Sequence, residues 1–221
     1  MTASPQPERA RPASRAQATR EAILDAAERL FAEHGLDNVS HRQISAAAGQ
    51  GNNAAVNYHF GTTADLVEAI VERHLAAVES LRARQLARVE GSADLRAWVD
   101  CLVRPTAQHL EELGSPTWYA RLSAQLATDP RRHDLVVERA LRSPTLRRIV
   151  DGLQACLPDV PPAVRAERSD MMRLLSVHLY AERETALATG RAPARASWGE
   201  CADGLVDAVV GMLTASVSRV G

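Results

Sequence analysis

Two groups of residues in this sequence have types and spacings that could support chemistry. His178 and Glu182 are four positions apart, so on a helix they would share one face and could begin a metal site. A helical ion pair, or a polar pair in a pocket, explains the same spacing without a metal. Gly49-Gln50-Gly51 could approach a phosphate, but a turn between two helices accounts for it equally well. Neither group predicts an activity by itself.

The residue types that many enzymes need are missing from the chain. All 26 lysine-plus-arginine residues are arginine, so neither a lysine Schiff base nor a P-loop with its lysine can form. The sequence contains no HExxH, GxSxG or CxxC motif. Cys101, Cys156 and Cys201 are far apart, and we expect reduced core residues rather than disulfides or metal ligands. We therefore expect no enzymatic activity, no cofactor and no metal.

The overall composition is that of an ordinary soluble globular protein. Of 221 residues, 46% are hydrophobic and 24% are charged, and the formal net charge is -1. Such a net charge gives no general sign of nucleic-acid binding, which requires locally placed cations. The longest apolar stretch, 205–217, is interrupted by Asp207 and is too short to span a bilayer. The polar N-terminus lacks the apolar core of a signal peptide, so we expect a cytoplasmic protein.

A local surplus of positive charge does occur near the N-terminus. Residues 1–17 combine proline, serine and arginine without hydrophobic periodicity, which predicts a flexible arm. No acidic residue lies between Glu8 and Glu21, whereas four arginines lie at positions 9, 11, 15 and 20. Such an arm could add nonspecific affinity for phosphate.

Hydrophobic periodicity after the arm predicts an all-α protein. A first helix opens at Thr19, and a second begins after Ser40, whose hydroxyl could cap the amide of Gln43. A third short helix is expected over about 52–60. A longer helix follows to about residue 89, capped by Thr62. Further helices are expected over 95–113, 117–127, 134–143, 145–156, 163–188 and 198–217.

This pattern predicts three parts of the chain. Residues 1–17 form the arm, residues 18–62 a three-helix domain with a helix-turn-helix, and residues 63–221 a second helical domain. Two short helices joined by a glycine turn, the second one polar, are typical of an element that docks in a DNA major groove. On periodicity alone, a solvated helix in a generic bundle is an equal alternative. A purely structural protein is a third one, although it gives the arm and the polar helix no purpose.

The sequence resembles the DNA-binding domain of the tetracycline-repressor (TetR/AcrR) family. The shared features are TREAILDAA at 19–27, LFAEHG at 30–35, ISAAAG at 44–49 and YHFG at 58–61. Together with the residues between them, they extend over about a quarter of the chain. The rest of the chain matches the family only in length and helical character. The resemblance implies a ligand-responsive transcriptional regulator, most often a repressor, that binds a palindromic operator.

The resemblance also implies the residues that contact DNA. By position they are Ser40, Arg42, Gln43, Asn52, Asn53, Asn57, Tyr58 and His59. Two departures from the family pattern affect this group. The turn before the recognition helix is one residue longer, at Gln50-Gly51, and Asn57 stands where the family's tyrosine usually lies, with Tyr58 one place later.

Two further features follow from the resemblance. One is a pocket for a small-molecule effector among the middle helices, for which Trp98, Leu102, Trp118, Tyr119, Leu122 and His178 are the lining candidates. Ordinary core packing explains any one of these apolar residues as well. The other is a homodimer formed by the last two long helices. The apolar residues expected to serve it are Leu174, Leu175, Val177, Leu179, Leu205, Val206, Val209, Met212 and Leu213.

Overall fold

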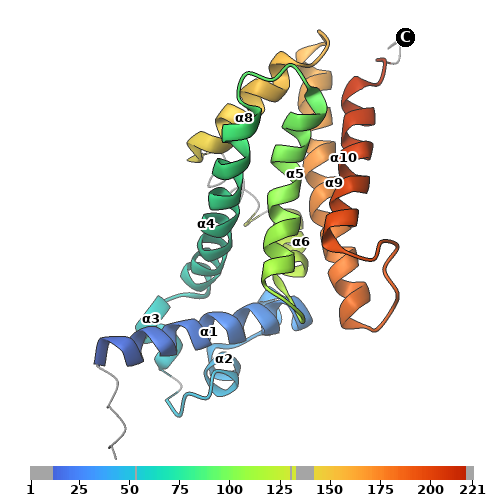
Figure 1. Cartoon of the computed structure of the whole chain (residues 1–221). Helices are drawn as coiled ribbons and strands as arrows, with labels where there is room; N and C mark the ends of the chain where they lie inside the picture. Colours follow the sequence, from blue (N-terminus) through green and yellow to red (C-terminus); the bar gives the residue numbers. More distant parts are fainter. Residues whose placement is uncertain (1–11, 53, 130, 133–141, 218–221) are drawn as a thin grey trace, which may run out of the picture. The chain divides into compact units, whose positions relative to one another are not determined.

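The computed structural model describes residues 12–52, 54–129, 131–132 and 142–217, and these residues form helices and no strand (Figure 1). The all-α prediction is therefore confirmed. Packing divides the chain into two compact units, residues 1–70 and 71–221. The division falls inside one helix, α4 (Thr63–Val89), so this helix contributes to both units.

The N-terminal unit is built on α1 (Pro12–His34), followed by the 3-10 turn η1 (Leu36–Asn38). Two short helices, α2 (His41–Ala47) and α3 (Ala55–Phe60), complete the unit before α4 begins. Helix α2 packs against both α1 and α3. The side chains that fill this core are fully or almost fully buried: Ile23, Leu24, Ala27, Phe31, Ile44, Val56, Phe60, Leu66 and Ile70.

Helix α1 begins at Pro12, seven residues before the predicted start at Thr19. Proline is favoured in the first turn of a helix because its missing N–H group has no helical partner there. The residues that follow, Ala-Ser-Arg-Ala-Gln-Ala, include several good helix formers. Helix formation therefore extends into the segment that composition alone assigned to the arm. Arg9 and Arg11 lie outside the described residues.

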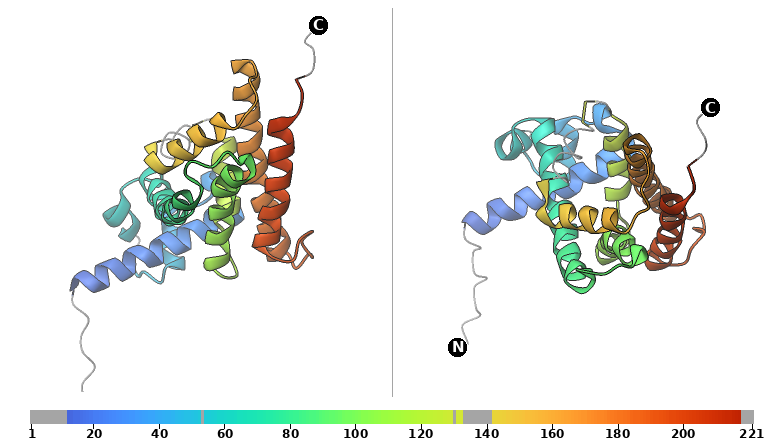
Figure 2. Two further views of the ribbon diagram at one scale, coloured as in Figure 1. Left: turned by 45° about the horizontal axis from the view of Figure 1, so that its top comes forward. Right: turned by 90° about the horizontal axis from the view of Figure 1, so that it is seen from above.

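The C-terminal unit contains the remaining helices, and their predicted positions are close to the observed ones. They are α5 (Leu95–Glu112), α6 (Tyr119–Thr128), α8 (Pro144–Ala155), α9 (Pro162–Ala188) and α10 (Trp198–Thr214). The helix predicted over 134–143 lies almost entirely outside the described residues. In Figures 1 and 2 α9 and α10 run side by side, and α10 also packs along the length of α5. Helix α6 packs on α9, and α8 packs on α5.

Helix α10 buries its apolar face within its own subunit. Leu205, Val206, Val209 and Leu213 are at most 4% exposed, and they lie in one core with Trp98, Val99 and Val103 of α5. The expectation that these four residues serve the dimer is therefore wrong, because packing against α5 already covers them. None of the described helices is long and apolar enough to cross a membrane.

Candidate DNA-binding surface and ligand cavity

The first helix of the predicted DNA-reading element is fixed at both ends by its own sequence. At the start, the Ser40 hydroxyl accepts from the Gln43 amide, and the Gln43 side chain accepts from the Ser40 amide at 2.8 Å, so the predicted capping box is confirmed. At the end, Gly49 has a φ of +68° and donates to the carbonyl of Ala46, and the Gln50 amide donates to the carbonyl of Ser45. These two bonds form a Schellman motif, which requires a residue such as glycine at position 49.

The third helix starts later than the sequence indicates. Asn52 accepts a hydrogen bond from the amide of Ala54 through its side-chain oxygen, at 2.9 Å, and so forms a turn before the helix. Helix α3 therefore begins at Ala55 rather than near Asn52. Gln50 and Gly51, where the resemblance implies a longer turn, lie before the helix.

The structure places most of the predicted DNA contacts on the outside of α2, α3 and the turn between them. Ser40, Arg42, Gln43, Asn52, Asn57 and Tyr58 are exposed and His59 is half-buried, while Asn53 lies outside the described residues. Tyr58 is the most prominent of them, because 84% of it is exposed although it is a large aromatic residue. Val56 and Phe60 of the same helix are buried and anchor its inner face.

A histidine that sequence reasoning missed connects the helices of this surface. His41 is the first residue of α2, its Nδ1 atom is hydrogen-bonded to Oδ1 of Asn57 in α3, and its Nε2 atom lies 3.0 Å from the Thr63 hydroxyl at the start of α4. The Asn57 oxygen accepts this bond from Nδ1 of His41 with one lone pair and keeps a second one. Asn57 is thus held in one orientation, and its amide NH₂ group can donate to a phosphate or to a base acceptor.

The start of α4 is capped as predicted. The Thr62 hydroxyl accepts from the Asp65 amide at 3.1 Å and donates to the Asp65 carboxylate at 2.7 Å, and the Thr62 amide also donates to this carboxylate. These bonds favour the charged carboxylate, so they hold the pKa of Asp65 below its usual value of 3.8. The same residues position the N-terminus of α4 beside the contact from His41.

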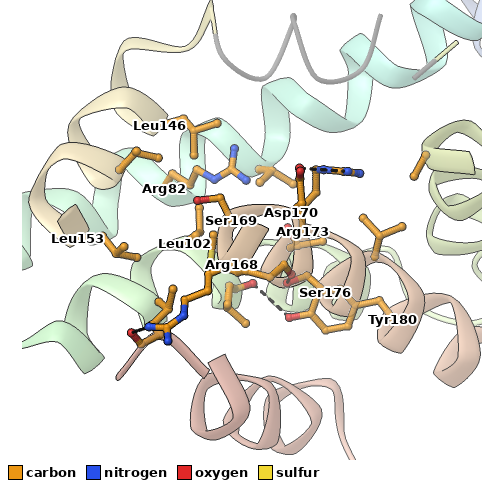
Figure 3. A pocket seen from close by; sticks show the side chains of 18 of the residues that line it. Arg82, Leu102, Leu146, Leu153, Arg168, Ser169, Asp170, Arg173, Ser176 and Tyr180 are labelled. Carbon is orange, nitrogen blue, oxygen red and sulfur yellow. Dashed lines mark hydrogen bonds and ion pairs between the residues drawn. The ribbon is translucent and has the colours of Figure 1, made fainter. Parts of the chain in front are cut away.

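The C-terminal unit encloses a cavity of about 530 Å³ (Figure 3). Its lining comes from α4, α5, α6, α8 and α9, from Leu213 of α10 and from the segment between α8 and α9. The larger apolar side chains of the lining, apart from its tyrosines, are Leu75, Val78, Leu102, Val103, Leu110, Leu146, Val150, Leu153, Leu157, Val160, Met172, Val177 and Leu213. A mostly apolar cavity of this volume is within the range of small-molecule binding sites.

Two family profiles match this chain. The profile described as bacterial regulatory proteins of the tetR family matches residues 23–70, and the one described as a tetracyclin repressor-like C-terminal domain matches residues 100–212, about half of the chain. The protein belongs to the TetR family. Members of this family are DNA-binding transcription regulators that act as dimers and are not enzymes, which confirms the predicted family and class of protein.

Solved structures of TetR regulators have the same fold. A protein from Shewanella sp. PV-4 assigned to the family has a TM-score of 0.60 at 15% identity, over 90% of this chain and 99% of its own. A TetR family transcription regulator from Marinobacter aquaeolei VT8 has a TM-score of 0.58 at 18% identity, over 88% and 96%. SmeT, the repressor of the Stenotrophomonas maltophilia multidrug efflux pump SmeDEF, has a TM-score of 0.57 at 20% identity, over 89% and 90%. Among curated proteins, no sequence matches this chain.

The cavity of this TetR regulator includes only some of the predicted pocket residues. Leu102 and Tyr119 line it, whereas Trp98, Trp118, Leu122 and His178 are not among its lining residues. Trp98 packs on Gly152, and its indole N–H donates to the carbonyl of Ser92 at 2.8 Å. Leu122 is fully buried in the subunit, and His178 is exposed on α9. Clustering of aromatic residues in the sequence therefore indicated helix packing more than cavity lining.

Polar side chains in the lining were missed at the sequence level. The arginines are Arg82 on α4 and Arg165, Arg168 and Arg173 on α9, accompanied by one carboxylate, Asp170 (Figure 3). Tyr180 also lines the cavity, where it donates to the carbonyl of Val103 at 3.2 Å, and burial raises its pKa. The hydroxyl groups of Thr106, Ser123, Ser169 and Ser176 and the amide of Gln154 also line the cavity.

A buried histidine pair lies behind Tyr119. The ring of His74 stacks on Tyr119 with 3.8 Å between centroids, and its Nδ1 atom is 2.7 Å from Nε2 of His109. His74 is 2% exposed and His109 is 6% exposed. One of these two nitrogen atoms must carry a proton, so one ring donates a hydrogen bond to the other. This bond connects α4 to α5 next to the cavity wall.

The other candidates for chemistry are separate from these two sites. His178 and Glu182 are both exposed, and Glu182 pairs with Arg191 at 3.0 Å. The described residues contain no group of three side chains that could hold a metal ion. All three cysteines are free, and burial raises the pKa of the Cys101 thiol to about 11. This thiol is therefore protonated at neutral pH, as expected for a core cysteine.

Proposed function

We propose that this protein is a repressor that binds a palindromic operator as a homodimer and releases it when a small molecule occupies the cavity. The observation that supports this most is the cavity itself, enclosed in the unit that shares helix α4 with the DNA-binding unit. SmeT, whose fold is similar, is described as the repressor of an efflux pump. By analogy, the proposed role of this chain is to repress transcription, and its proposed location is the cytoplasm.

The proposed DNA contacts are the exposed residues of α2, α3 and their turn. Arg42, Asn57, Tyr58 and His59 have polar groups available for phosphates or bases. Ser40 and Gln43 are assigned a smaller part, because both side chains already serve the capping box. Asn52 likewise uses its side-chain oxygen in the turn. Asn53 remains a proposed contact from its position in the sequence.

The proposed dimer uses α9 together with the outer side of α10. Met171, Leu174 and Leu175 of α9 are 44%, 38% and 38% exposed, and their i, i+3, i+4 spacing puts them on one face of the helix. The outward positions of α10 include the small residues Ala208 and Gly211, which allow a second helix to come close. A two-fold axis through these helices would bury the apolar side chains of both copies in a four-helix arrangement.

Helix α4 provides the proposed path from cavity to DNA. Leu75, Val78 and Arg82 of this helix line the cavity, and its first residue, Thr63, contacts His41 of α2. A ligand that moves α4 in either dimer subunit would change the separation of the two recognition helices. Because the half-sites in DNA are fixed in space, the operator affinity would fall. A coupling of about 1–3 kcal/mol per site is sufficient for such a switch.

The experiment begins with selection from a random duplex library, followed by gel shift on the selected sequence. We expect an enriched palindrome, and failure to enrich one at moderate salt would refute the DNA part of the proposal. Operator affinity is then measured with and without a panel of cell metabolites. Leu102→Trp, which fills the cavity, should bind operator but lose the response, whereas Trp118→Ala, outside the lining, should keep it. A metabolite that binds in the cavity without changing operator affinity would exclude the switch.

A further inference from the structure

The charges that line the cavity are not balanced. Four arginines face one carboxylate, Asp170, among the lining residues. Two more carboxylates lie just outside the lining, since Glu79 is 3.9 Å from Arg82 and Asp159 is 3.8 Å from Arg165. Even when both are counted, the described residues that line and border the cavity carry an excess of positive charge.

Two of the four arginines already have partners within the protein. Arg168 is buried and donates to the carbonyls of Leu213 and Ala215, at 2.8 and 2.5 Å, where it caps the end of α10. Arg173 pairs with Asp170 at 3.5 Å (Figure 3). Both guanidinium groups therefore have roles in the structure that do not need a ligand.

Arg82 differs from these two. Only 12% of its side chain is exposed, and its Nε atom is buried without a hydrogen-bond partner among the described residues. Its nearest carboxylate oxygen, Oε2 of Glu79, is at 3.9 Å, beyond hydrogen-bond distance, while Oε1 of Glu79 accepts from Ser143 at 2.6 Å. A buried charged donor without an acceptor is costly, and an anionic acceptor in the cavity would remove this cost.

Arg165 repeats the arrangement nearer to the solvent. Its Nε atom is also buried without a partner, its side chain is 38% exposed, and Asp159 is beyond hydrogen-bond distance at 3.8 Å. Two guanidinium groups with unused donors thus border a mostly apolar cavity. Arginine presents its donors in a planar fork that fits a carboxylate through two parallel hydrogen bonds.

We infer that the cavity binds an amphipathic carboxylate, an apolar molecule with one anionic head that is held by Arg82, with Arg165 as a second, weaker contact. The aliphatic lining takes the apolar body, and the excess positive charge disfavours cationic ligands. This inference rests on the proposed function only in its choice of site. The binding of the anion can be measured without DNA.

The test is calorimetric titration of the full chain with matched compounds that differ only in the head group. Decanoate is compared with decanol and decyltrimethylammonium, and naphthoate with its alcohol and its quaternary ammonium counterpart, all below their micelle concentrations. We expect at least one carboxylate to bind about tenfold or more tightly than its alcohol, and the cationic compounds not to bind. Equal affinity for acid and alcohol, or no binding of any carboxylate, would overturn the inference.

Variants assign the head-group contact. Arg82→Gln should weaken binding of the carboxylate about tenfold and leave binding of the alcohol unchanged. Arg84→Gln, the same change at an exposed position of α4, is the matched control and should have no effect. Carboxylate binding that is unaltered by Arg82→Gln would overturn the assignment. If Arg82→Gln does not fold, the head-group comparison on the wild type still decides the ligand class.

Gel shifts separate this inference from the proposed function. A carboxylate that binds through Arg82 but leaves operator affinity unchanged refutes the switch and keeps the site. A neutral metabolite that releases DNA while no carboxylate binds supports the switch and refutes the anionic ligand class.

Discussion

His41 shows how much of the proposed DNA-binding surface can depend on a side chain that connects the helices beneath it. Its two ring nitrogens contact Asn57 in α3 and Thr63 in α4, so one residue fixes the side chain of a proposed contact and the start of the next helix. An imidazole can do this because it has two polar atoms on opposite sides of a rigid ring. His41 is therefore a positioning residue for the recognition helix.

His41→Ala should reduce operator affinity while the protein stays folded. Loss of two side-chain hydrogen bonds, each with a net free energy of about 0.5–1.5 kcal/mol, predicts a reduction of roughly tenfold in affinity for the selected palindrome. Gel shift and a thermal melt give the two readouts. His34→Ala, on a side chain that is 56% exposed at the end of α1, is the control. An unchanged affinity in His41→Ala would mean that Asn57 needs no support to bind.

Residue roles were the part of the site that sequence reasoning resolved least. Ser40, Gln43 and Asn57 were correctly placed on the surface as a group, but the hydrogen bonds that occupy them depend on the geometry of the α2–α3 turn. Arg82 gave a readable signal, since it follows Leu75 and Val78 on one helical face and puts a charge where an apolar residue is expected. The role of Arg168 could not be known, because the carbonyls that it binds lie at the end of α10.

At the scale of elements, capping residues were predicted well because a cap is local. Ser40 with Gln43 and Thr62 with Asp65 are each three residues apart, and backbone geometry alone brings such pairs together. The cavity could not be predicted in this way. Its walls come from helices more than a hundred residues apart in the sequence, and small differences in their packing decide whether a residue such as Trp98 fills the core or borders a space.

The cap of α4 should make stability depend on pH in a defined range. The Thr62 hydrogen bonds lower the pKa of Asp65 in the folded state, so they stabilise the fold above the unfolded value of about 3.8 and this stabilisation is lost as the pH falls through the lower folded value. Asp65→Asn should therefore have a lower melting temperature than wild type at neutral pH. The difference should shrink at a pH well below 3.8. A difference that stays constant over this range would contradict an electrostatic cap.

The contact between α5 and α8 depends on one glycine. A Cβ atom at Gly152 would come within 2.4 Å of the ring of Trp98, which is held by its bond to Ser92 and is 4% exposed. Gly152→Ala should destabilise the protein by about 1–3 kcal/mol through overpacking, although alanine favours the helix by about 1 kcal/mol. Urea unfolding measures the change.

Gly199→Ala is the matched control for this prediction. The nearest atom to a Cβ atom there is the Ser197 hydroxyl at 3.7 Å, an ordinary contact, so the helix preference should act alone and stabilise α10 by about 0.5–1 kcal/mol. Stabilisation of Gly152→Ala as well as Gly199→Ala would contradict the prediction, because it would mean that the Trp98 ring can move away from α8.

At the scale of the whole molecule, the sequence predicted the class of protein more reliably than its assembly. A family motif near the N-terminus and helical periodicity throughout were enough for the fold class, because both are properties of continuous segments. The dimer face was assigned too broadly, because an apolar stripe such as that of α10 does not reveal whether it meets its own subunit or a partner. Only packing against α5 shows that Leu205, Val206, Val209 and Leu213 belong to the subunit core.

Leu174→Glu tests the assembly without disturbing the core. Leu174 is 38% exposed on α9, so a carboxylate is tolerated in the free subunit but would be buried unpaired at the proposed two-fold interface, which is strongly unfavourable. Light scattering should show a dimer for the wild type and a monomer for the variant. Leu113→Glu, at a leucine that is 43% exposed at the end of α5, should remain a dimer. Val209→Glu cannot replace this test, because Val209 is fully buried in the subunit and the change would unfold it.

The monomeric Leu174→Glu variant should also lose most of its operator affinity, because the recognition helices of two subunits would no longer bind as one unit. A Leu174→Glu protein that remains a dimer would place the interface elsewhere on the subunit.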